Sequence, residues 1–182
     1  MKPILFNTEM VQAILDGRKT QTRRLCKGQP QDGAISPETM GYMPPYGVGD
    51  VLYVRETWTD IPETAPGNLH YRADATQADL DWFRENGWKW RPSIHMPKEA
   101  ARLFLRVTGV RCERLQDMMP EDCANDGGFE PEAVKVVGIA PLFGTLWDSI
   151  LRKDDLAKCG WAANPWVFVV SFERIYDYEK MQ

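Results

Sequence analysis

A run of basic side chains near the start of the sequence is the stretch best suited to hold an anion. Between Arg18 and Lys27 there are five basic residues and no acidic one: Arg18, Lys19, Arg23, Arg24 and Lys27. The whole chain, in contrast, has a net charge of −4 and a pI near 5.3. A local positive patch on an acidic protein favours a confined anionic ligand over a long duplex. The alternative is a solvated basic edge that binds nothing, because charge runs are commonly exposed faces.

One carboxylate is predicted to lie on a buried strand face. Residues 51–58 alternate as a strand does, which places Glu56 on the same face as Leu52, Val54 and Trp58. A buried carboxylate needs a partner, and the basic run offers candidates in Arg18, Lys19 and Arg24. Both a structural ion pair and a carboxylate that contacts a ligand in a cleft fit this position.

Aromatic side chains gather in or beside the predicted loops. They are Tyr42, Tyr46, Trp58, Tyr71, Trp88 and Trp90. Proteins that read single-stranded RNA stack bases on such rings, and Tyr71 and Trp90 are the two that we expect to contact a ligand. Packing in the core is the alternative for each of them, and Trp147 and Trp166 are assigned to the core outright.

Cysteine and histidine spacing gives no sign of a metal site. The four cysteines contain no CxxC pair, and His70 and His95 are far apart in the sequence. Structural zinc sites have closer ligand spacing, so we expect no metal, no cofactor and no disulfide. The thiols are expected to be small buried hydrophobes. His95 lies in a proline-rich loop, where a structural hydrogen bond and acid–base work both fit.

Composition indicates one globular domain. The chain has 182 residues, of which 43% are hydrophobic and 26% charged, which is ordinary globular usage. No apolar run reaches the roughly 18 residues that span a membrane, and a carboxylate at Glu9 comes too early for a signal peptide. We therefore expect a cytoplasmic protein with no membrane partner.

The pattern of apolar residues and turns predicts a mixed α+β fold. Strands are expected at 19–24, 51–58, 101–115 and 165–175. Helices are expected from Thr8 to the stop at Gly17, at 78–86, at 120–126 and at 142–151, the last being the clearest helical spacing in the chain. Strands joined by irregular loops, with short covering helices, suggest a small β-barrel. Two loop-rich insertions are expected in this single domain of residues 1–182, at about 28–48 and 59–100.

Four stretches, taken in order, resemble the ASCH-domain family. They are Gly17-Arg-Lys-Thr-Gln-Thr-Arg23, the Gly49-Asp50 that opens a strand, the segment from Leu115 to Gly127, and the closing strand from Trp166 to Phe172. Together they cover about half of the chain. The remaining stretches, which include Glu56-Thr-Trp58, resemble a larger subgroup often encoded by phages and prophages.

The resemblance implies a PUA-like barrel associated with RNA and nucleosides. One small bacterial branch of the family hydrolyses the amide of N4-acetylcytidine with a Lys, a Thr and a Glu. Lys19 and Thr22 match the first two, and the position of the Glu falls on Asp126. A lysine beside a hydroxyl can act as a base if burial lowers its pKa, and a carboxylate can orient the pair. Asp is shorter than Glu by one methylene, about 1.5 Å, and Glu56 could stand in for it.

Our sequence-based hypothesis is a cleft lined by Lys19, Thr22, Arg23, Glu56 and Asp126, with Arg18, Arg24, Tyr71 and Trp90 as further ligand contacts. The expected ligand is RNA or a nucleoside, bound with or without amide hydrolysis. A phage assembly or interaction protein without nucleic-acid chemistry is the alternative, since it fits the acidic pI. Ribonuclease activity is a weaker one, because the two histidines form no recognisable pair.

Overall fold

The computed structural model describes residues 1–27, 29, 43–61 and 68–176. Contacts within the chain define two compact units. The first comprises Met1–Asp16, Val51–Leu105 and Arg174–Gln182, and the second comprises Gly17–Asp50 and Arg106–Glu173. Both contain helices and strands, which confirms the mixed α+β class. The single domain stays a prediction, and most of the insertion expected at 28–48 lies outside the described residues.

The first unit is built on two parallel strands. Strand β1 (Lys2–Leu5) pairs with β3 (Val51–Arg55) in the register that joins Lys2 to Leu52. Helix α1 (Thr8–Leu15) follows β1, and the Asn7 side chain caps it by accepting a hydrogen bond from the backbone N–H of Met10. The expected alternation along β3 is present, because Leu52 and Val54 are fully buried.

The remainder of the first unit is a hairpin with a helix. Strands β4 (Trp58–Asp60) and β5 (Leu69–Tyr71) pair antiparallel, and Arg91 forms an isolated bridge to Trp58 on the other edge. Helix α2 (Gln77–Glu85) begins with a capping box between Thr76 and Asp79. Short 3₁₀ turns lie at Arg72–Asp74, Ser93–His95 and Lys98–Ala100.

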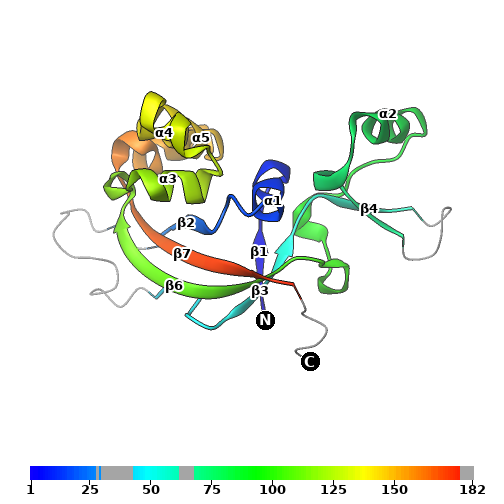
Figure 1. Ribbon diagram of the computed structural model, residues 1–182, viewed down its shortest axis with the longest axis horizontal. Coiled ribbons are helices and arrows are strands. Elements are labelled where there is room, and N and C mark those ends of the chain that lie inside the picture. Colours follow the sequence, from blue (N-terminus) through cyan, green and yellow to red (C-terminus); the bar gives the residue numbers. More distant parts are fainter. Residues whose placement is uncertain (28, 30–42, 62–67, 177–182) are drawn as a thin grey trace. The chain divides into compact units, whose positions relative to one another are not determined.

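The second unit contains the longer strands. Strand β6 (Phe104–Arg114) begins in the first unit and continues into the second, where β7 (Trp166–Ile175) lies between it and β2 (Gln21–Leu25). Figure 1 shows β6 and β7 as two long, curved strands side by side. Strand β7 is buried on both faces from Val167 to Val170. No pairing among the described strands closes a barrel, so the barrel stays a prediction.

Short helices cover one face of this sheet (Figure 1). They are α3 (Pro120–Gly127), α4 (Pro131–Val137), a π-helical turn at Ala140–Gly144, α5 (Thr145–Ser149) and α6 (Leu156–Cys159). Further 3₁₀ turns lie at Leu115–Asp117, Lys153–Asp155 and Trp161–Ala163. The core beneath the helices joins Phe143 and Trp147 to Val167 and Val169. Trp147 is buried as expected, whereas Trp166 is only half-buried, with the Arg114 guanidinium 4.5 Å from its ring centroid.

The cysteines are free thiols, and two of them come close together. The sulfurs of Cys26 and Cys112 lie 3.8 Å apart, and Cys26 and Cys123 are buried. Burial raises the pKa of the Cys123 thiol to about 11. Among the described residues, no helix combines the length and the apolar character needed to cross a membrane.

Candidate functional site

Helix α3 aligns two carboxylates toward β2 in the second unit. Pro120 occupies the first turn of the helix, and Gly128 ends it in the left-handed conformation with a φ of 68°. Asp122 and Asp126 are one turn apart and therefore share a face. Asp126 is 3% exposed. A carboxylate at such a position must be paired to remain ionised.

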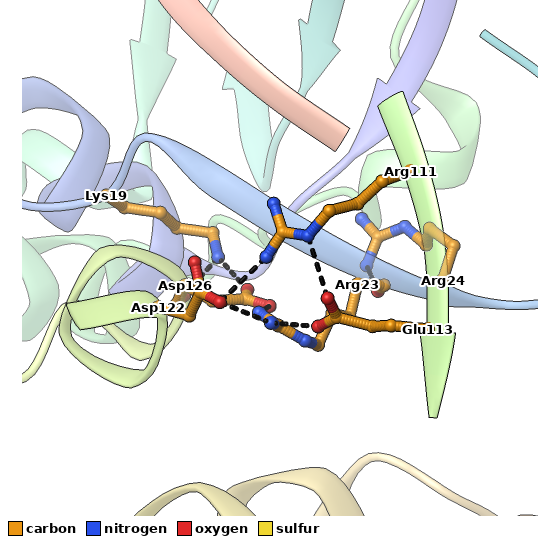
Figure 2. Close-up of polar contacts among 7 residues, drawn as sticks. All are labelled: Lys19, Arg23, Arg24, Arg111, Glu113, Asp122 and Asp126. Atoms are coloured by element: carbon orange, nitrogen blue, oxygen red, sulfur yellow. Dashed lines mark hydrogen bonds and ion pairs between the residues drawn. The ribbon is translucent and has the colours of Figure 1, made fainter. Parts of the chain in front are cut away.

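Lys19 supplies one partner of Asp126. Its amine donates a hydrogen bond to Asp126 Oδ1 at 2.7 Å and another to the backbone carbonyl of Asp126, as Figure 2 shows. The Thr20 N–H donates to the Asn125 carbonyl at 2.9 Å, and the Arg18 guanidinium donates to the Gly128 carbonyl. Residues 18–20 thus follow the C-terminal end of α3, where the helix dipole favours cations.

Arg23 joins three carboxylates. Its Nη1 lies 3.2 Å from Asp126 Oδ2, and its Nη2 lies 3.2 Å from Asp122 Oδ2 and also contacts Glu113 (Figure 2). Arg111, from β6, completes the group with contacts of 2.7 Å to Glu113 Oε2 and to Asp122 Oδ2. We call these six residues, Lys19, Arg23, Arg111, Glu113, Asp122 and Asp126, the charge cluster. It holds three cations and three carboxylates.

Burial and charge act against each other on the pKa values of the cluster. Burial lowers the pKa of Lys19 below its ordinary value, and Arg24 and Arg23 add to this effect, although Asp126 opposes it. Burial pushes the pKa of Asp122 upward, but Arg23 and Arg111 together hold it below its ordinary value. A lysine with a lowered pKa is a candidate base, while a fully paired network can equally serve only structure.

Strand alternation separates the remaining predicted residues of β2. Thr22 is buried opposite Val170, and Arg23 lies opposite Val169, so that Thr22 and Arg24 share the face of β2 opposite to Arg23. Arg24 is half-buried, and burial lowers its pKa. Thr22 is therefore not on the face of β2 from which Arg23 reaches α3.

Glu56 belongs to the first unit, and its partner is not in the basic run. It is 1% exposed, and Arg102 donates to its two oxygens from Nε at 3.0 Å and from Nη2 at 3.1 Å. The expected pairing with Arg18, Lys19 or Arg24 is thus replaced by a planar fork-to-fork pair. Burial raises the pKa of Glu56, against the opposing effect of Arg102. Arg102 also pairs with Asp74 and lies 4.0 Å from the ring centroid of Tyr71.

Tyr71 and Trp90 meet at a pocket of about 170 Å³ in the first unit. Its side chains include His70, Tyr71, Asp74, Asp79, Phe83 and Trp90. The structure therefore brings these two predicted ligand contacts together, in a setting that contains two carboxylates. Across the described ranges, no group of three or more His, Cys, Asp or Glu is arranged to hold a metal ion.

Sequence reasoning missed Arg111, Glu113, Asp122 and Arg102. A usable signal existed for the first three. Arg111 and Glu113 are two apart in a predicted strand and so share a face, and Asp122 is four before Asp126 in a predicted helix. For Arg102, the sequence gives no comparable signal, because it shows only a basic residue next to a run of apolar ones.

Comparison with known proteins finds two similar solved structures. No family model and no curated protein matches the chain. One structure is a protein of Enterococcus faecalis described by the family model DUF984; it has 12% identity and a TM-score of 0.41, and the match covers 96% of this chain and 72% of that one. The other is an ASCH domain from Lactobacillus crispatus, with 10% identity, a TM-score of 0.42 and coverage of 95% and 78%. Structural similarity with such low identities and TM-scores does not identify a family or an activity for this chain.

Proposed function

We propose that this chain is an ASCH-type protein that binds a nucleoside or single-stranded RNA, with the charge cluster as its reactive centre. One observation carries the proposal. Lys19 and Asp126 come from two of the four stretches that resemble the ASCH family, are 107 positions apart in sequence, and are joined by a buried hydrogen bond of 2.7 Å. The sequence resemblance alone had assigned both residues to one site.

The geometry suits hydrolysis of an amide such as that of N4-acetylcytidine. In its neutral form, the Lys19 amine takes a proton from a water molecule that attacks the acetyl carbonyl. The carbon–nitrogen bond then breaks, and the protonated lysine returns its proton to the departing N4 amine, leaving cytidine and acetate. Asp126 holds the amine in place throughout. Its carboxylate and its backbone carbonyl both contact Lys19, although its side chain is one methylene shorter than the Glu of the related hydrolases.

Burial of the amine favours a second candidate, which is binding without hydrolysis. The side chain of Lys19 is 0% exposed, so a substrate can reach its amine only if neighbouring side chains move. In this second candidate the cluster is structural, and RNA phosphates contact exposed cations outside it, such as Arg18 and Lys27.

Chromatography of N4-acetylcytidine incubated with purified protein tests the first candidate. We expect slow release of cytidine by the natural chain, a faster rate for Asp126→Glu, and none for Lys19→Met. Lys135→Met is the matched control, because Lys135 is exposed on α4 and pairs only with Glu132 among the ion pairs of the described residues. If no variant yields cytidine at high protein concentration, the hydrolytic candidate is wrong. If RNA binding is also absent, an interaction protein without nucleic-acid chemistry is the remaining explanation.

A further inference from the structure

The pocket of the first unit has the size and lining of a site for one small planar ligand. Its volume of about 170 Å³ is below the range of roughly 300–1,000 Å³ that holds drug-sized molecules. Every lining residue lies within the stretch 69–90, so strand β5, helix α2 and the segments that flank α2 form the pocket by themselves. It is distinct from the charge cluster, which belongs to the other unit.

An aromatic platform forms one part of the lining. The rings of Phe83 and Trp90 are stacked, with centroids 4.6 Å apart and planes 24° apart, and His70 meets Phe83 edge-on at 5.7 Å. Phe83 is buried, and the backbone beside Trp90 is fixed by two hydrogen bonds between Trp58 and Arg91, of 3.3 and 2.7 Å. Pre-formed aromatic surfaces of this kind stack nucleobases.

The polar groups of the pocket disfavour phosphate. Asp74 is occupied by Arg102, whereas Asp79 uses its Oδ2 to accept hydrogen bonds from the N–H and the hydroxyl of Thr76. These bonds with Thr76 hold the pKa of Asp79 below its ordinary value, so the carboxylate is a charged acceptor at neutral pH. A carboxylate attracts N–H donors and repels both phosphate oxygens and base carbonyls.

The ring of His70 provides a second observation that favours a ligand in this pocket. Its Nε2 is enclosed and, among the described residues, has no hydrogen-bond partner. An enclosed polar atom without a partner costs roughly 1–3 kcal/mol, which a ligand offering a donor or an acceptor would recover.

We propose that this pocket binds the base of a nucleoside that carries an amino group, with the base stacked on the ring of Trp90, which Phe83 supports from behind, and the amino group directed to Asp79. The inference rests on the proposed function, of which it names a recognition site. Cytidine and uridine are the sharpest pair of probes, because they differ in having an amino group or a carbonyl at one ring position. The carboxylate of Asp79 should favour cytidine.

Isothermal titration of the full chain with cytidine and with uridine tests this. We expect cytidine to bind more tightly, with Trp90→Ala weakening its binding about 5- to 150-fold, the equivalent of the 1–3 kcal/mol that base stacking contributes. Trp90→Phe keeps a ring for folding and should weaken binding less. Asp79→Asn should remove the preference for cytidine. Thr76→Ala is the matched control, since it breaks the capping box but keeps the carboxylate, and the preference should persist.

The result is separable from that of the charge cluster, because the preference for cytidine should respond to Asp79→Asn, whereas release of cytidine from N4-acetylcytidine reports on Lys19. Equal binding of the two nucleosides, or binding of neither, would overturn the proposal. Tighter binding of tetramethylammonium than of cytidine would overturn it as well and would identify a pocket for organic cations.

Discussion

The side-chain amine of Lys19 is buried, away from water. Removing an ammonium group from water costs several kcal/mol, and the protein offsets this cost with two acceptors from one residue, the carboxylate and the carbonyl of Asp126. The nearby guanidinium of Arg23 works against the charge on Lys19 and is itself neutralised by Asp122 and Glu113. As a result, the pKa of the Lys19 amine is lowered, and the amine loses its proton more readily than that of an exposed lysine.

Glu56 should make stability depend on pH. Because its pKa is raised in the folded protein, the native state binds more protons than the unfolded chain between the ordinary Glu pKa of about 4.3 and the raised pKa. The free energy of unfolding should therefore fall as pH rises through this window, by at most about 1.4 kcal/mol per pH unit. Urea denaturation at a series of pH values measures it.

Glu56→Gln should flatten this part of the profile. Glu132→Gln is the control, because that side chain is 79% exposed and should keep the wild-type profile. A Glu56→Gln profile that superimposes on that of the natural chain would show that Glu56 does not titrate in the way its burial indicates.

Among the elements, the helical segment Ala140–Ser149 depends on one glycine. A Cβ at Gly144 would lie 2.9 Å from the ring of Trp161, closer than side chains pack. Gly144→Ala should therefore lower the free energy of unfolding by about 1–3 kcal/mol. Gly109→Ala on β6 is the matched control, because its Cβ would meet Ser171 at an ordinary 3.7 Å and should cause little loss. Equal stability of the two variants in urea titrations would contradict the close packing on Trp161.

Elements with strong local signals could be predicted from the sequence. Helix α1, helix α2, helix α3 and strand β7 fall where periodicity and turn residues put them, whereas the strand expected at 51–58 is divided into β3, which ends at Arg55, and β4, which begins at Trp58. Strand β1 and helix α4 were missed. Strand β1 has only four residues, and its partner β3 lies far along the chain, so that the pairing leaves no local pattern. Helix α4 has seven residues and begins at a proline, which reads as a loop.

The candidate site was predictable only in part, for a related reason. Its anchors, Lys19, Arg23 and Asp126, were named in advance, yet charge alone could not show that the basic run faces carboxylates. Two of the five cations in the basic run, Lys19 and Arg23, are buried and paired with carboxylates. The pairing of Glu56 with Arg102 was equally hidden, because long-range ion pairs leave no periodic signature.

At the scale of the whole molecule, the charge balance is unfavourable to a long contact with a nucleic acid. The net charge is −4, and within the basic run it is Arg18 and Lys27 that are exposed. Binding of single-stranded RNA should therefore weaken with salt on a shallow slope, about −0.7 per phosphate engaged. Fluorescence titration of labelled RNA at several salt concentrations measures this slope.

Arg18→Gln combined with Lys27→Gln should reduce the slope, whereas Lys135→Gln on α4 should leave it unchanged. Binding that ignores salt, or a slope that the double variant does not alter, would exclude the basic run as the contact with RNA. Arg18 and Lys27 belong to the second unit and the pocket to the first, so the double variant should leave the preference for cytidine over uridine unchanged.

The balance of three cations and three carboxylates in the charge cluster also limits which substitutions these six positions can accept during evolution. Loss of any one member upsets this balance, and at the buried pairs of Asp126 with Lys19 and Arg23 the removal of one partner typically costs about 3–5 kcal/mol. Replacement of both partners by apolar residues costs far less. Positions 19 and 126 should therefore change together among homologues, and positions 23, 111, 113 and 122 should vary as a linked set. These positions should therefore coevolve, although they are far apart in the sequence.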